Sequence, residues 1–112
     1  MDGQTTGGSV RLDDEGYLVE PGDWNEEIAA RLARSENVDL TDDHWKVLRF
    51  MREYYQDRSI APDARFTIRF LADVVGYGAH AKKRLCELFP YGYVKQACKI
   101  AGMKRPRAWS TG

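Results

Sequence analysis

The chain has 112 residues, of which 43% are hydrophobic and 30% are charged. That length suits one domain with one modest core, and the composition is typical of a folded globular protein rather than a disordered one. No apolar run approaches the roughly 20 residues that span a bilayer, and the opening MDGQTTGGSV lacks the basic and apolar regions of a signal peptide. We therefore expect a cytoplasmic protein with no membrane partner.

The 17 acidic and 17 basic residues cancel, but they are unevenly distributed along the chain. Residues 1–57 hold 14 acids and 6 bases, a balance of −8, whereas residues 58–112 hold 3 acids and 11 bases, a balance of +8. Such polarity is typical of a docking face for an anionic partner, nucleic acid included. The alternative is that the two halves pair with each other across the fold.

The residues that most often bind metals or catalyse reactions form no recognisable constellation. Cys86 and Cys98 stand 12 positions apart with no CxxC motif, which excludes a zinc finger and disfavours a disulfide framework. His44 and His80 are isolated in the sequence and are expected to be ordinary structural histidines. The sequence predicts no metal and no cofactor.

Two short strands are predicted near the N-terminus, after a mobile tail over residues 1–9. Residues 10–12 and 17–19 are strand-like and flank an acidic turn that Gly16 closes, which indicates a β-hairpin. An isolated hairpin is marginally stable, so this one is expected to lie against helices.

A first helix is predicted after the break at Pro21. Asp23 is a suitable N-cap with Glu26 three residues later, a variant of the capping box. The helix should extend to about Arg34, because Trp24, Ile28 and Leu32 recur every four residues.

A second, central helix should begin after Thr41, which is a suitable N-cap followed by two acids in the first turn. One face of this helix is strongly apolar, with Trp45, Leu48, Met51 and Tyr55 at helical spacing. The density of aromatic residues is better explained by core packing than by a cofactor site.

Three shorter helices are predicted in the second half of the chain. The third begins with Pro62 and ends at Gly76, and the fourth covers 79–89. The fifth covers 94–101 and is closed by Gly102 as a C′ glycine. The predicted fold is mainly α: a small bundle of about five helices with an N-terminal β-hairpin and a flexible C-terminal arm. The predicted organisation is a disordered tail over 1–9, a helical domain over 10–102 and an arm over 103–112.

Four segments in this order and spacing resemble the DsrC/TusE family: EGYLVEPGDW, LTDDHWKVLRFMREYY, APDARF and LFPYGYVKQACKIAG. This family includes the gamma subunit of dissimilatory sulfite reductase and the sulfur-relay protein of tRNA thiolation. The resemblance covers about residues 14–108. It implies a helical bundle with a hairpin and a mobile arm, in a protein that carries sulfur on a cysteine next to the end of the arm. It also implies a carrier or substrate protein more than an enzyme.

The chain departs from the family at the residue that would carry the sulfur. The family's upstream cysteine matches Cys98, but the residue 11 positions further on is Trp109 rather than cysteine. Without the tip thiol the chain cannot perform the arm-borne relay or close the arm with a disulfide. A second departure is Tyr93, where the family usually has proline.

Cys98 has two possible roles. It is a candidate sulfur-accepting thiol if Lys95 and Lys99 lower its pKa, since the thiolate is the nucleophile. Alternatively, Cys98 is a small buried hydrophobe at a helix contact.

Basic residues of the C-terminal half are predicted to form a docking surface, in which Arg and Trp are typical anchors. Lys82, Lys83 and Arg84 are expected to face outward from the fourth helix, and Arg65 to pair with acids of the N-terminal half. The alternative for the arm is a solvated tail. The predicted binding residues are Lys95, Lys99, Lys104, Arg105, Arg107 and Trp109.

Three functions therefore remain open. The first is a non-catalytic family member that binds a sulfite reductase or a sulfur-relay partner in a regulatory role. The second is a sulfur carrier that uses Cys98 alone. The third is nucleic-acid binding by the fourth and fifth helices acting as a helix-turn-helix-like pair.

Overall fold

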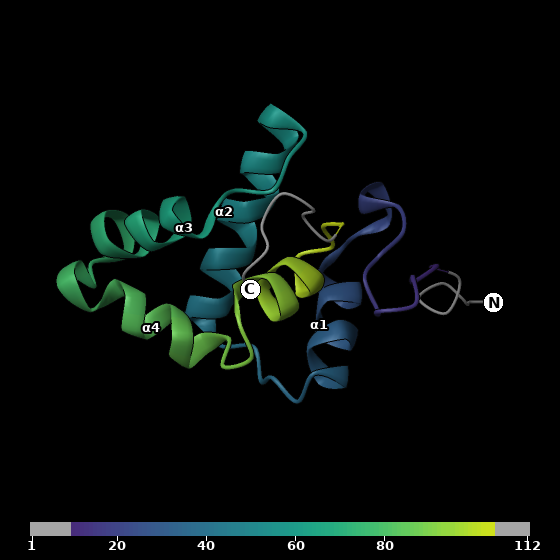
Figure 1. Ribbon diagram of the computed structural model, residues 1–112, viewed down its shortest axis with the longest axis horizontal. Coiled ribbons are helices and arrows are strands. Elements are labelled where there is room, and N and C mark those ends of the chain that lie inside the picture. Colours follow the sequence, from purple (N-terminus) through teal and green to yellow (C-terminus); the bar gives the residue numbers. More distant parts are fainter. Residues whose placement is uncertain (1–9, 105–112) are drawn as a thin grey trace.

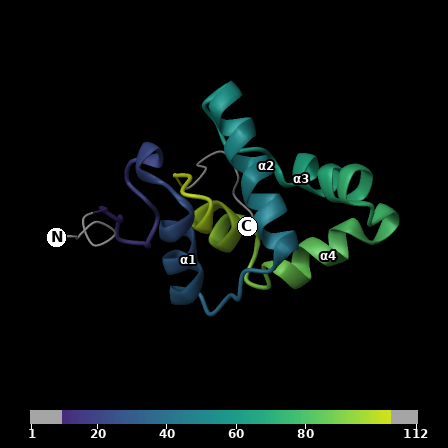
Figure 2. The same ribbon diagram turned by 180° about the vertical axis from the view of Figure 1, so that it is seen from behind.

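The structure, a computed structural model, describes residues 10–104. These residues are mainly helical, as the sequence predicts, and Figures 1 and 2 show the helices gathered around the C-terminal segment. None of the described helices is both long enough and apolar enough to cross a bilayer. The α-helices are α1 (Glu26–Ser35), α2 (Asp42–Arg58), α3 (Ala64–Phe70) and α4 (Ala81–Leu88), and the main π-helical segments are η3 (Leu71–Val75) and η5 (Tyr93–Cys98).

The predicted N-terminal β-hairpin is wrong, because the described residues contain no strand. The chain does reverse direction here, but only one isolated antiparallel bridge forms, between Leu12 and Leu18. The turn is held by Asp13, whose side chain accepts hydrogen bonds from the backbone N–H groups of Glu15 and Tyr17, both at 2.9 Å. Leu18 is buried whereas Leu12 is 47% exposed. Val10 packs against the core, but Arg11 and Leu12 are exposed, so the first run buries little apolar surface and pairs with the second run at a single bridge.

Helix α1 begins two residues later than the sequence predicts. Pro21–Asp23 forms a 3₁₀ turn, η2, and the N-cap is Asn25, whose side chain accepts a hydrogen bond from Ile28 N at 2.8 Å. Asp23 is therefore not the cap. The apolar face is as predicted, and it buries Ile28, Ala29, Leu32 and Ala33.

Helix α2 is central, and Thr41 is its N-cap as predicted. Its partner in the capping box is His44, whose Nδ1 accepts a hydrogen bond from Thr41 N at 3.0 Å. The other ring nitrogen, Nε2, lies 2.8 Å from the carbonyl oxygen of Leu88 and donates to it. The ring also meets Phe89 edge to face. His44 therefore connects the start of α2 to the end of α4, and this requires the neutral imidazole.

Substituting His44 should remove a pH dependence of stability. Burial lowers the pKa of His44 from its ordinary 6.5, so the unfolded chain takes up the proton first as the pH falls. The stability that the neutral ring contributes is complete above pH 6.5 and is lost as the pH falls from there toward the folded pKa. His44→Gln should cost about 1–2 kcal/mol at neutral pH and flatten this decline, measured by urea unfolding between pH 5 and 8.

The exposed histidine provides the control for that measurement. His80 is exposed, so His80→Gln should leave both the stability and its pH dependence unchanged. A pH dependence that persists in His44→Gln and disappears in His80→Gln would contradict the assignment.

The third predicted helix changes its geometry part of the way along. Asp63 caps α3 by accepting a hydrogen bond from Arg65 N at 2.9 Å, so Pro62 precedes the helix rather than opening it. The helix then widens into η3 and ends at Gly76, which has a φ of +105°. The predicted end is confirmed. The short 3₁₀ turn η4 (Gly78–His80) then leads into α4.

The C-terminal helical segment is the most buried part of the fold. Figures 1 and 2 show η5 between α1 and α2, and Ala97, Cys98, Ile100 and Ala101 are each 0% exposed. The helix ends as predicted at Gly102, which has a φ of +78°. Met103 N bonds to Cys98 O at 3.0 Å and Gly102 N to Lys99 O at 3.1 Å, the two bonds of a Schellman motif.

Candidate functional site

Cys98 is enclosed in the core rather than presented to a partner. Its side chain is 0% exposed, and burial raises its pKa to about 12. The prediction that the neighbouring lysines lower the pKa of Cys98 is therefore wrong, because its pKa is set by the loss of solvation on burial. The structure favours the alternative in which Cys98 is a small buried hydrophobe.

Tyr93 opens η5 with a buried phenol. Its hydroxyl donates to the carbonyl oxygen of Pro62 at 2.8 Å and lies 2.8 Å from the hydroxyl of Thr67, which is also buried. Burial raises the pKa of Tyr93. These bonds join η5 to α3 and to the residue before its cap, so Tyr93 has a structural role.

The carbonyl groups at the end of the C-terminal helix are bonded by two side chains from distant parts of the chain. The indole Nε1 of Trp24 donates to Ile100 O at 2.9 Å. The guanidinium of Arg52 donates to Ala101 O at 3.0 Å and to Pro21 O at 2.9 Å, and it lies 4.8 Å from the centre of the Trp24 ring. Helix ends leave such carbonyls without internal partners. Trp24 and Arg52 therefore fix the direction in which the chain leaves the domain.

Two of the predicted binding residues meet at a depression on the outer side of η5. Lys99 Nζ lies 3.1 Å from a carboxylate oxygen of Glu36 and 5.2 Å from the centre of the Tyr17 ring. Lys95 is exposed, and Tyr91 beside the depression is 70% exposed. We call this depression the outer pocket; it is lined by Glu15, Tyr17, Glu36, Tyr91, Lys95 and Lys99.

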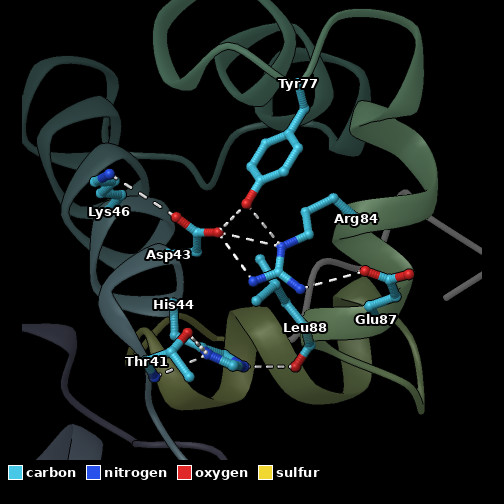
Figure 3. A network of polar contacts seen from close by, with 8 residues as sticks. All are labelled: Thr41, Asp43, His44, Lys46, Tyr77, Arg84, Glu87 and Leu88. Atoms are coloured by element: carbon cyan, nitrogen blue, oxygen red, sulfur yellow. Dashed lines mark hydrogen bonds and ion pairs between the residues drawn. The ribbon is translucent and has the colours of Figure 1, made fainter.

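Arg84 belongs to a different network and does not face outward as predicted. Its Nη2 and Nε donate to one carboxylate oxygen of Asp43, at 2.9 and 3.1 Å, and the hydroxyl of Tyr77 donates to the same oxygen (Figure 3). These hydrogen bonds, that of Tyr77 first, lower the pKa of Asp43. Glu87 and Lys46 extend the network at its two ends. Its effect is to join α4 to the start of α2.

The remaining predicted residues are scattered or lie outside the described residues. Lys82 and Lys83 are exposed on α4, and Lys104 is exposed at the end of the described chain. Arg65 pairs with its neighbour Asp63 at 3.5 Å, so its predicted pairing with the N-terminal half is wrong. The structure therefore offers no support for the predicted nucleic-acid-binding surface on α4 and η5. The predicted binding residues Arg105, Arg107 and Trp109 lie outside the described residues.

Sequence signals for Trp24 and Arg52 are weak. The four-residue spacing places Trp24 on the apolar face of α1, although it precedes that helix. Arg52 follows the buried Met51 in α2, and the strong apolar pattern of that helix gives no sign that this arginine has a bonding partner far away in the sequence. Within residues 10–104, no three His, Cys, Asp or Glu side chains converge as metal ligands.

Comparison with characterised sequences gives consistent matches. Residues 4–108 match the family described as DsrC like protein. The sulfurtransferase TusE of Photorhabdus laumondii is 40% identical over 100 residues, which cover 89% of this chain and 90% of that protein. The sulfurtransferase TusE homolog of Haemophilus influenzae is 38% identical over 97 residues, covering 87% of this chain and 89% of that protein.

Solved structures show the same similarity in three dimensions. The oxidized gamma-subunit of the dissimilatory sulfite reductase (DsrC) from Archaeoglobus fulgidus aligns with a TM-score of 0.79 and 33% identity, over 87% of this chain and 89% of that one. DsrC of Allochromatium vinosum aligns with a TM-score of 0.77 and 39% identity, over 87% of both chains. The similarity therefore extends over most of the fold and is not confined to one motif.

Proposed function

We propose, from the premise that this chain belongs to the DsrC-like protein family, that it binds a sulfite reductase or a sulfur-relay protein in a regulatory role without carrying the sulfur itself. The family is one of sulfur relay, and its relatives named above include sulfurtransferases. In this proposal the chain retains the binding of a partner protein but not the transfer of sulfur.

The burial of Cys98 is the observation that supports this proposal. Persulfide transfer proceeds by attack of a thiolate that must reach the partner's sulfur. Cys98 is 0% exposed, with its pKa raised to about 12. The position 11 residues further on is Trp109, and the only other cysteine in the chain is Cys86. Neither cysteine position of the family therefore supplies an accessible thiolate.

The outer pocket is the surface that we assign to partner binding. Tyr91 is 70% exposed beside the exposed Lys95, and aromatic and cationic residues of this kind are common anchors in protein interfaces. Lys99 pairs with Glu36, and these two partly buried charged side chains form the floor of the outer pocket. A partner that presents a carboxylate beside an apolar side chain would complement Tyr91 and Lys95.

The test combines a binding measurement with a sulfur-loading measurement. The full chain is titrated by calorimetry with a purified dissimilatory sulfite reductase. In a separate experiment it is titrated with a sulfur-relay protein that donates sulfur to a TusE. The Cys86→Ser variant, in which Cys98 is the only thiol, is then incubated with a persulfide donor and weighed intact, beside a TusE that loads under the same conditions. We expect binding to one of the two proteins and no gain of about 32 Da at Cys98.

A matched pair of double variants separates the outer pocket from general charge effects. Tyr91→Ala with Lys95→Glu should weaken binding at least about tenfold, whereas Lys82→Glu with Lys83→Glu on α4 should change it little. Sulfur loaded on Cys98 would overturn the proposed regulatory role and favour a sulfur carrier that uses Cys98. Absence of binding to both proteins would overturn the proposed function.

A further inference from the structure

A tight turn between α4 and η5 carries Tyr91, the exposed ring of the outer pocket; Figure 1 shows this connection. The N–H of Gly92 donates to the carbonyl oxygen of Phe89 at 3.0 Å, which closes a β-turn with Pro90 and Tyr91 at its centre. Pro90 suits its place, because the ring of a proline fixes the backbone at the first central position of such a turn. The side chain of Tyr91 is 70% exposed. Its ring therefore contributes little to the core, although the backbone beneath it is closed.

The turn is anchored to the core from both of its sides. On the α4 side, the carbonyl oxygen of Leu88 accepts the hydrogen bond from His44, and the buried ring of Phe89 meets the His44 ring edge to face. On the η5 side, the backbone N–H of Tyr91 donates to Oε1 of Gln96 at 3.0 Å. The structure therefore fixes the backbone on which an exposed side chain stands.

Gln96 provides this second anchor at a cost to the fold. Its side chain is 0% exposed, and its Nε2 has no hydrogen-bond partner among the described residues. The amide cannot be turned over, because its oxygen must face the N–H of Tyr91. A buried donor without a partner is destabilising, and a methionine could fill the same space without that donor.

The stability of the fold does not explain why a glutamine is needed here. The N–H of a residue in an exposed turn can bond to water, so Tyr91 does not depend on a buried acceptor. The hydrogen bond that Gln96 accepts is offset by the donor that it leaves unpaired. What the glutamine provides is a fixed backbone at Tyr91.

We propose that Gln96 is a positioning residue that holds Tyr91 in place for partner binding. This inference rests on the proposed function, in which Tyr91 and Lys95 of the outer pocket contact the partner protein. Lys95 and Gln96 are adjacent in η5, with Lys95 exposed and Gln96 buried. One turn of helix thus presents one contact residue and fixes the other. A contact residue whose backbone is already fixed loses less conformational entropy on binding, which raises the affinity.

Two substitutions that loosen the turn test its effect on binding. Gln96→Met removes the acceptor and the unpaired donor together, so the midpoint of urea unfolding should change little. Calorimetric titration with whichever of the two partner proteins the parent chain binds should show an affinity about fivefold lower. Pro90→Gly loosens the same turn at an exposed residue and should weaken binding to a similar degree. In a Tyr91→Ala background neither change should weaken binding further, because the side chain that they position is absent.

Tyr93→Phe is the matched control within η5. It removes the buried hydroxyl that bonds to Pro62 and Thr67 and leaves the turn at Tyr91 intact. It should therefore lower the midpoint of urea unfolding and leave the affinity for the partner unchanged.

Amide hydrogen exchange, measured by NMR, reports on the turn without any partner. In Gln96→Met the amide of Tyr91 should exchange at least about tenfold faster than in the parent chain. The amide of Ala101, which bonds to Ala97 O at 2.9 Å within the helix, should keep its rate.

Three results would overturn the role of Gln96. An unchanged exchange rate at Tyr91 in Gln96→Met would mean that Gln96 does not fix the turn. Equal weakening of binding by Gln96→Met and Tyr93→Phe would assign the effect to the stability of η5. Further weakening in the Tyr91→Ala background would show that the effect does not pass through Tyr91. A parent chain that binds neither protein would overturn the proposed function and the use of the turn with it, a result distinct from the other three.

Discussion

Gly102→Ala should lower the free energy of unfolding by about 3 kcal/mol, the largest effect that we expect from a single methyl group in this chain. Two causes add at this position. Gly102 has a φ of +78°, which strains any residue with a Cβ, and the added Cβ would lie 2.4 Å from Cδ1 of Trp24. The clash matters because Trp24 cannot move without losing its hydrogen bond to Ile100 O.

Gly76→Ala separates the two causes. Gly76 has a φ of +105° but nothing within 4 Å of an added Cβ, so its substitution should show the backbone strain alone, about 1 kcal/mol. Both variants are compared with the parent chain by urea unfolding. Equal losses in the two variants would mean that the Trp24 ring yields freely and does not brace the end of the helix.

The helices could be predicted because their signals are local. The apolar face of α2, the cap at Thr41 and the stops at Gly76 and Gly102 depend on residues a few positions apart, and the structure confirms them. The family resemblance rests on several such segments in order, and it too is confirmed. The errors at Asp23 and Pro62 are shifts of two residues in which another polar side chain, Asn25 or Asp63, provides the cap.

The site could not be predicted in the same way, because its contacts join residues far apart in the sequence. Lys99 pairs with Glu36 and Arg84 with Asp43, which bears out the interpretation that the basic half pairs with the acidic half at these two positions. Nothing near Arg84 in the sequence indicates that its guanidinium turns inward. The same holds for Cys98: its basic neighbours suggested an activated thiol, but its pKa is set by the packing around η5.

That packing also gives Cys98 a role in the fold that does not depend on sulfur transfer. Cys98 lies among side chains that hold η5 between α1 and α2, where a small apolar side chain is needed whatever its reactivity. Tyr93 adds buried hydrogen bonds to the same segment. The cysteine can therefore persist for its shape, and its presence alone says little about sulfur transfer.

Alkylation of the folded chain should show a difference of about a thousandfold between Cys98 and an ordinary thiol. The pKa of Cys98 is raised from 9.0 to about 12, so near neutral pH its thiolate fraction falls by about three orders of magnitude. Burial slows access further. Cys86 is exposed on α4 and should react at an ordinary rate with iodoacetamide. Intact mass spectrometry over time should therefore show one fast modification and one that is very slow.

Two serine variants assign the modifications, and denaturant provides the reference rate. Cys86→Ser should remove the fast reaction, whereas Cys98→Ser should leave it intact. About 6 M guanidinium exceeds the unfolding midpoint of ordinary domains, so the packing around Cys98 is lost there. Under these conditions both cysteines of the parent chain should react at similar rates. Rapid modification of Cys98 in folded Cys86→Ser would instead require the segment around η5 to open often. A thiol exposed in that way could still accept sulfur, so the regulatory role would lose its main support.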